Sequence, residues 1–375
     1  MSISLLRNSS HSLDILWIVL YGSRSRLFRL PLPSNRLTVW INELESIEAN
    51  NKTLLKRRDS MTAEDKRLWW EQRKALDKRM SCLILNIKQL LGTFIDWKQN
   101  VESENVSIDS AVLNTASLCG QYSEELTDLV FNSLQLQGVS TNRQVVVDTL
   151  RRRHVDDELD NVFMSDHPKS SSDSVCRLLL SADLYRFPWE HILDEACVRC
   201  VPILLAVPSI QSSVEYCNQN FVSYVINPSG DLVETERRFA PLVTTSTDFC
   251  GVIGRAPSEQ EVLDFLTASK LYLYCGHGGG DAYLSNNKIS KLNRIAPSLL
   301  IGCSSGKIKS VGVADPEGNP IAYTKASSPF VVCNLWDVTD KDIDAFTMRL
   351  LNGLLEMDGY DIKVVAKMVH EARTE

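Results

Sequence analysis

The hydrophobic positions of this chain follow one pattern in its first half and another in its second half. From Thr62 to Trp97, apolar residues recur at every third or fourth position, which predicts one buried face of a long helix. Thr62 and Asp65 have the spacing of a capping box, a pair that begins helices. A second helix is expected over Ser110–Leu136. These patterns predict that the first half is mainly helical.

In the second half, the apolar positions form short continuous runs bounded by turn residues. Continuous runs of this length are typical of strands buried on both faces, as in a mostly parallel sheet. Helices are expected between the runs, at Ser258–Ser269 and Asp340–Glu356. The predicted strands are Val175–Ser181, Val201–Val207, Phe221–Asn227, Lys270–Cys275, Pro297–Cys303 and Pro329–Trp336. The fold class predicted for this half is α/β, with helices flanking the sheet.

A cluster rich in Ser, Asp and Pro, Met164–Ser174, separates the two patterns and predicts a domain boundary. We therefore expect an unassigned N-terminal segment over 1–34, a mainly helical domain over 35–174 and an α/β domain over 175–375. A chain of 375 residues is long enough for more than one hydrophobic core.

Composition excludes several classes of function. The formal net charge of −7 gives no basic surface for direct nucleic-acid binding. The apolar run Ile15–Tyr21 is too short to insert across a membrane. Ten dispersed cysteines fit reduced thiols inside a cell better than a disulfide scaffold. Cys197 and Cys200 form a lone Cys-x-x-Cys pair, so no metal site is expected.

Candidate chemistry lies at the ends of two predicted strands. His277 follows the strand "LYLYC" within the glycine-rich sequence "GHGGGD", and Cys303 follows the strand "LLIG" 26 residues later. A connection of this length can supply one crossover between neighbouring parallel strands, and sites in such sheets gather at the carboxyl ends of strands. The sequence therefore predicts a His/Cys pair at one edge of the sheet.

Glycine-rich loops also bind phosphate, but these do not fit the known patterns. "GCSSGKI" has one residue too few between its glycines for a Walker loop, and Ile308 stands where a Ser or Thr would hold magnesium. A dinucleotide fingerprint counted from Gly276 would need glycine at Asp281, where an acid would repel pyrophosphate. Neither a nucleotide nor another cofactor is expected.

A serine esterase is a second alternative. "GCSSG" satisfies G-x-S-x-G with Ser304 as nucleophile, "HGGG" resembles an oxyanion motif, and Asp337 or Asp340 with His370 would complete the triad order. Against this, α/β-hydrolases normally place more than one crossover between the two motifs.

A cysteine protease uses the same residues more directly. The thiol of Cys303 is the nucleophile and His277 the acid/base. The backbone N–H groups of Gly278 and Cys303 would form the oxyanion hole.

Three sequences carry a resemblance to a known family: "LYLYCGHGGGDAYL", "LLIGCSSGKI" and "PFVVCNLWDVTDKDIDAF". They resemble the separase proteases, which belong to the caspase-like cysteine peptidases. Further matches are "RFPWEHI", "YVINPSGDLVETERRF" and, in the helical half, "WWEQRKALDKRM". The resemblance implies a caspase-like protease domain over 175–375, a substrate-positioning role for the helical domain, and a dyad of His277 and Cys303 with Gly278 in the oxyanion hole.

The resemblance also implies a substrate, a partner and a location. Separases cut the kleisin subunit of cohesin after arginine at anaphase, and a securin-like inhibitory chaperone holds them inactive. We expect Asp337, and next Asp340, to bind the substrate arginine, with Trp336 lining the pocket. The expected location is the cytoplasm and nucleus, with chromosomes or spindle during mitosis. Family members extend further at both ends, so an inactive, shortened binding protein is the alternative.

Overall fold

The structure is a computed structural model that describes residues 2–10, 13–21, 24–32, 36–55, 62–95, 162–166, 175–180, 183–194, 196–200, 221–311 and 314–374. None of the helices among these residues combines the length and apolar character needed to cross a bilayer. Internal contacts group the chain into two compact units. The first unit comprises Met1–Trp40, Ile87–Leu184 and Cys197–Ser209, and the second comprises Ile41–Asn86, Tyr185–Ala196 and Ile210–Glu375.

The first unit contains a six-stranded sheet of order β4-β3-β2-β1-β5-β6. Neighbouring strands from β4 to β1 are antiparallel, whereas β1, β5 and β6 are parallel. Residues 1–34, unassigned in the sequence analysis, therefore supply three strands, and the apolar run Ile15–Tyr21 lies in the second. The strands are β1 (Ser2–Ser10), β2 (Leu13–Tyr21), β3 (Arg24–Leu32), β4 (Val162–Asp166), β5 (Cys176–Leu180) and β6 (Cys197–Cys200).

Two long helices follow, α1 (Arg36–Leu55) and α2 (Ala63–Ile95). The predicted helix over 62–97 and its capping box are confirmed: the Asp65 N–H donates to Thr62 Oγ1 at 3.2 Å, and the Thr62 N–H donates to Asp65 Oδ2 at 2.9 Å. Arg79 of α2 forms a bidentate salt bridge with Glu43 of α1, in which Nε donates to Oε1 at 2.8 Å and Nη2 donates to Oε2 at 2.9 Å. The predicted helix over 110–136, the strand over 201–207 and most of the predicted domain boundary lie outside the described residues, so the three-part division stays a prediction.

The second unit contains a five-stranded sheet of order β13-β10-β9-β7-β8, and every neighbouring pair of strands is parallel. The predicted parallel sheet is confirmed for the strands predicted over 221–227, 270–275, 297–303 and 329–336. The strand predicted over 175–181 is β5, which lies instead in the sheet of the first unit, where it pairs with β1 and β6. The strands are β7 (Val222–Ile226), β8 (Phe249–Ile253), β9 (Leu271–Cys275), β10 (Ser298–Ile301) and β13 (Val331–Cys333). Of these, β8 was not predicted from the sequence.

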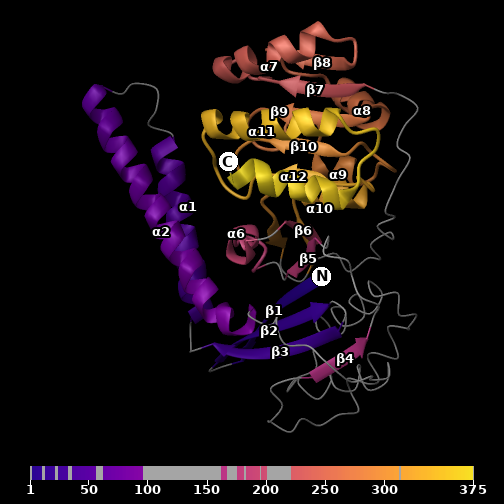
Figure 1. The fold of residues 1–375 in the computed structure, drawn as a ribbon. Coiled ribbons are helices and arrows are strands. Elements are labelled where there is room, and N and C mark those ends of the chain that lie inside the picture. Colours follow the sequence, from indigo (N-terminus) through magenta and orange to yellow (C-terminus); the bar gives the residue numbers. More distant parts are fainter. Residues whose placement is uncertain are drawn as a thin grey trace. The chain divides into compact units, whose positions relative to one another are not determined.

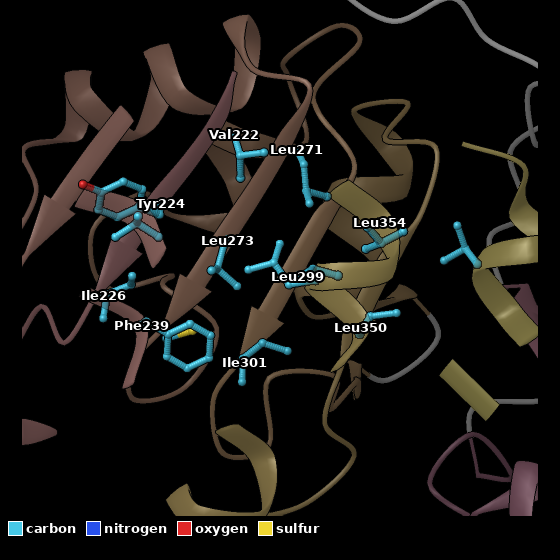
Figure 2. Close-up of a cluster of buried hydrophobic side chains, with 14 of the residues drawn as sticks. Val222, Tyr224, Ile226, Phe239, Leu271, Leu273, Leu299, Ile301, Leu350 and Leu354 are labelled. Carbon is cyan, nitrogen blue, oxygen red and sulfur yellow. The ribbon is translucent and has the colours of Figure 1, made fainter. Parts of the chain in front are cut away.

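Helices cover both faces of this sheet (Figure 1). On one face, alternate residues of β7, β9 and β10, such as Leu273 and Leu299, pack against α7 (Val233–Thr245), α11 (Asp340–Leu355) and α12 (Ile362–Thr374), as Figure 2 shows for α7 and α11. The intervening residues, such as Tyr272 and Leu300, pack against the other helices on the opposite face. These are α8 (Glu259–Ala268), α9 (Asn286–Ile289) and α10 (Asn319–Lys325).

Burial on both faces explains the continuous apolar runs of the sequence, since neither set of alternating positions meets water. The predicted helices over 258–269 and 340–356 are α8 and α11. Smaller elements complete the described structure: α6 (Trp189–Leu193) and a hairpin of β11 (Lys309–Val311) and β12 (Ala314–Glu317).

Candidate active site

The order of the strands brings four loops together at one edge of the five-stranded sheet. Because all five strands are parallel, the segments that follow them leave the sheet at the same edge. Cys303 follows β10, and His277 follows the neighbouring strand β9. The loop that begins at Asn334 follows β13 on one side, and the turn that begins at Asn227 follows β7 on the other.

The backbones that carry His277 and Cys303 are in direct contact. A Cβ atom on Gly302 would lie 2.0 Å from the carbonyl oxygen of Gly278 and 2.3 Å from that of Gly276. Only glycine allows two backbone segments to approach so closely. The residue before Cys303 therefore packs on both residues that flank His277, and the structure brings the two predicted site residues to one place.

The glycines after His277 allow backbone angles and close contacts that other residues would not. Gly278 and Gly280 have φ angles of +63° and +83°, a region that favours glycine. A Cβ atom on Gly279 would lie 1.8 Å from Asn319 Nδ2. The Tyr274 hydroxyl donates to the His277 carbonyl oxygen at 2.8 Å and fixes the start of the loop.

Two backbone donors remain for a ligand at this edge. Among the residues that the structure describes, no protein acceptor takes the N–H of Gly278 or that of Cys303. These are the two groups that the sequence analysis expects in an oxyanion hole, a site that needs donors aimed at a developing negative charge.

Cys303 is half-buried, and its Sγ lies 3.5 Å from the carbonyl oxygen of Val338. Burial raises the pKa of this thiol above its ordinary value, and the nearby carboxylates of Asp337 and Asp340 raise it further. Cys275, the cysteine that ends β9 just before the glycine-rich loop, is fully buried, and burial raises its pKa well above the ordinary range. Of these two thiols, Cys303 is the more accessible.

The raised pKa predicts how Cys303 reacts with pH. A thiol is nucleophilic only as its thiolate, so raising the pKa moves the onset of reactivity to higher pH. The rate of alkylation of Cys303 by iodoacetamide should rise about tenfold per pH unit from pH 7 to pH 9, without a plateau below pH 9. Peptide mass mapping at a series of pH values measures this rate.

The exposed Cys250 of the same unit serves as the internal control for the reagent. A plateau in the rate at Cys303 already at pH 6 to 7 would mean a standing thiolate–imidazolium pair and would contradict the prediction.

The loop after β13 is hydrogen-bonded to the loop that carries Cys303. The Ser304 N–H donates to the Trp336 carbonyl oxygen at 3.0 Å, and the Gly306 N–H donates to that of Asn334 at 2.8 Å. In return, Asn334 Nδ2 donates to the Gly302 carbonyl oxygen at 3.1 Å. Trp336 and Asp337, both predicted to bind substrate, therefore lie beside the cysteine loop.

The four acidic residues of this loop and of the first turns of α11 have different surroundings. Asp337 Oδ1 accepts the Ser304 hydroxyl at 2.6 Å. Asp340, the second candidate for the substrate arginine, is the first residue of α11, and Thr339 before it is the N-cap. The hydroxyl of Thr339 donates to Asp342. Asp344 is buried, and accepts from Thr235 at 3.1 Å and Arg238 at 3.1 Å.

Helix α1 supports this region from residues far away in sequence. Asn51 Nδ2 donates to the Asp337 carbonyl oxygen at 2.7 Å. Glu48 accepts from Lys307, in the segment after Cys303, at 2.7 Å and from Arg186 at 3.1 Å. Asn51 precedes Asp337 by 286 residues, so no local sequence signal could have found this contact.

The residues of the esterase alternative are not arranged as a triad. Its Ser304 has a φ of +54°, as a strained nucleophile turn would require, but the hydroxyl donates directly to Asp337. In a serine triad the carboxylate instead orients a histidine. His370 lies on α12, where its Nδ1 is 3.1 Å from Arg373 Nη2.

One residue of the site was missed. Asp231, in the turn after β7, places Oδ2 2.7 Å from His277 Nε2. The sequence contained a signal for it, because Asp231 follows a predicted strand by only a few residues, as His277 and Cys303 do.

Comparisons with known proteins identify the family of this chain. The family model described as "Separin, protease domain" matches residues 95–343, which is more than half of the chain and includes both His277 and Cys303. The separin of Schizosaccharomyces pombe is 28% identical over 94% of this chain and 21% of its own length, and that of Mus musculus is 30% identical over 87% and 16%. The chain spans about a fifth of the length of these curated relatives.

The fold is similar to that of a solved relative. The separase of the Saccharomyces cerevisiae separase–securin complex superimposes with a TM-score of 0.66 at 23% identity, over 99% of this chain and 29% of that one. This likeness supports the predicted caspase-like α/β fold with a helical part before it. Since the family model covers most of the α/β unit and both strand ends of the site, the chain belongs to the separin protease-domain family.

Proposed function

We propose that this protein is a cysteine endopeptidase that cleaves peptide bonds after arginine, with Cys303 as nucleophile and His277 as general acid/base. The observation that carries the proposal is the packing of Gly302 on the carbonyl oxygens of Gly276 and Gly278, which joins the loops of both residues. Membership of the separin protease-domain family supports the same chemistry.

The reaction follows from the arrangement of these groups. His277 takes the proton of Cys303, and the thiolate attacks the carbonyl carbon of the scissile bond. The N–H groups of Gly278 and Cys303 stabilise the oxyanion that forms. The intermediate collapses as His277 protonates the leaving amine, and the acyl group remains on sulfur. Water, deprotonated by His277, then hydrolyses the thioester and restores the thiol.

Burial raises the pKa of the Cys303 thiol, which disfavours a thiolate before substrate binds. Proton transfer to His277 is therefore part of the reaction, which makes the orientation of the imidazole important. This feature distinguishes the proposed enzyme from peptidases that keep a standing thiolate.

Arginine specificity is assigned to the acids of the loop after β13. A guanidinium binds best to a carboxylate that can accept two parallel hydrogen bonds. Asp337 is the first choice and Asp340 the second, since both are close enough to Cys303 to affect its pKa. Trp336, half-buried in the same loop, supplies an apolar wall for the arginine side chain.

The proposed substrate is the kleisin subunit of cohesin, and the proposed inhibitory partner is a securin-like chaperone. The names of the relatives and the securin in the solved complex support these assignments. The corresponding location is the cytoplasm and nucleus, and chromosomes or spindle in mitosis.

An irreversible peptide probe ending in an arginine acyloxymethyl ketone tests the proposal. The thiolate displaces the acyloxy group and leaves a thioether that peptide mass mapping can locate. An adduct on Cys303 is the expected result, and a citrulline probe, which lacks the positive charge, should react much more slowly. An adduct on Ser304 would favour the esterase. A folded sample that takes no probe would favour an inactive binding protein.

A further inference from the structure

We infer that Asp231 is a positioning residue for His277, and that it makes Nδ1 of the imidazole the nitrogen that exchanges protons with Cys303 and the substrate. The inference rests on the proposed function. It starts from the contact between Asp231 Oδ2 and His277 Nε2, whose 2.7 Å separation is that of a strong hydrogen bond.

The turn that carries Asp231 is held in place on both sides. Asn227, buried at the end of β7, accepts the Leu232 N–H on Oδ1 at 2.8 Å and donates from Nδ2 to Glu236 at 2.7 Å. The Asn227 N–H in turn donates to the carbonyl oxygen of Cys275, two residues before His277, at 2.8 Å. Asp231 therefore stands in a fixed relation to the histidine loop, although its own side chain is exposed.

The sheet places the three groups in the order that a relay requires. The strands β7, β9 and β10 are consecutive neighbours, and they are followed by Asp231, His277 and Cys303 respectively. The loop that carries His277 thus lies between the loops that carry the carboxylate and the thiol. An activated nucleophile typically has a base beside it, and a third group that orients this base.

The chemistry of the carboxylate selects the tautomer. An ionised carboxylate only accepts hydrogen bonds, so Nε2 of His277 carries the proton in this contact and Nδ1 keeps its lone pair. When Nδ1 takes the thiol proton, the resulting imidazolium faces the negative charge of Asp231 and is stabilised by it. The carboxylate itself touches neither substrate nor sulfur.

The imidazole and the carboxylate are 57% and 58% exposed, so their contact adds little to the stability of the fold. Replacing Asp231 should therefore leave the thermal unfolding temperature unchanged and affect catalysis alone. Asp231→Ala is expected to lower kcat for an arginine peptide amide by about 10- to 100-fold. This loss does not exceed the total rate enhancement that general acid–base catalysis typically contributes. The KM should stay within about twofold, since substrate binding is not altered.

Asp231→Asn should lose at least as much activity as Asp231→Ala, because the amide can donate to Nε2 and stabilise the wrong tautomer. The corresponding arginine nitrophenyl ester should be less sensitive to both changes, because its leaving group is the anion of an acidic phenol and departs without a proton from His277. A purely structural role would lower amide and ester hydrolysis alike.

Glu234→Gln is the matched control. It removes the same charge three residues further along, from an exposed acid paired with Arg237, and should change kcat by less than about twofold. Asp231→Glu should recover part of the activity. Full activity of Asp231→Ala on the amide, or equal losses on amide and ester, would overturn the inference.

Nuclear magnetic resonance of ¹⁵N-histidine-labelled protein gives a readout that does not depend on activity. The wild-type chain should show the Nε2-protonated tautomer at the signal that disappears in His277→Ala, and Asp231→Ala should shift that signal towards a tautomer mixture. An unchanged signal would also overturn the inference. If the wild-type chain shows this tautomer but does not react with the arginine acyloxymethyl ketone, the proposed function is wrong. The hydrogen bond between Asp231 and His277 would then be present without the proposed activity.

Discussion

Replacing Cys303 by serine should reduce hydrolysis of an arginine peptide by at least about 10⁴-fold, the order of loss found when a nucleophile is removed from a protease. The reason is that the histidine of the site is suited to a thiol and not to a hydroxyl. The hydroxyl proton is far more tightly held than that of a thiol, and a histidine arranged for a thiol cannot remove it efficiently. A fluorogenic peptide with arginine before the scissile bond measures the rate.

The serine variant should keep its fold, because an oxygen can still donate to the Val338 carbonyl that the sulfur faces. Equal thermal unfolding temperatures would show this. Cys250→Ser, the same change at an exposed cysteine of the same unit, should leave the rate unchanged. Retention of more than about one per cent of the activity in Cys303→Ser would point to another nucleophile, with the neighbouring Ser304 the first candidate.

The parallel sheet could be predicted because its strands are buried on both faces. Leu273 and Tyr272 face opposite layers and are both fully buried, so "LYLYC" is apolar at every position. The first N-terminal strand lacks this signal, since "SISLLRNSS" mixes polar and apolar residues, and antiparallel pairing with β2 organises it. The strand β8 was missed because only one of its five residues is fully buried.

The candidate site was partly predictable for the same reason. His277 and Cys303 are unusual residues at the ends of strong strands that are close in sequence. Asp231 is 46 residues from His277, and it reaches His277 because β7 is the spatial neighbour of β9, although β8 lies between them in sequence. Asn51 and Glu48 contact the site from a helix that lies 286 and 259 residues earlier in the sequence than their respective partners, Asp337 and Lys307. The order of strands in the sheet and the contacts between residues far apart in sequence are features of tertiary structure, which local sequence patterns do not reveal.

The arginine pocket gives the second large effect. Asp337→Asn should lower kcat/KM for an arginine peptide by about 10²- to 10³-fold, since two charge-assisted hydrogen bonds to the guanidinium are weakened. The Ser304 hydroxyl already holds Oδ1 of this carboxylate, and Asn51 holds its backbone, so the group is oriented before substrate arrives. A peptide with citrulline in place of arginine should lose this advantage in the wild-type chain, and the two substrates should be cleaved at similar rates by the variant.

Substitutions of the neighbouring acids, Asp340 and Asp344, test whether Asp337 is the residue that binds the substrate arginine. Asp344→Asn should act on stability, because that carboxylate is buried against Thr235 and Arg238, and its effect should appear in thermal unfolding with arginine preference kept. If Asp340→Asn abolishes the preference for arginine over citrulline while Asp337→Asn keeps it, the pocket belongs to the first turn of α11. The hydrogen bond from Ser304 to Asp337 would then serve only to join the two loops.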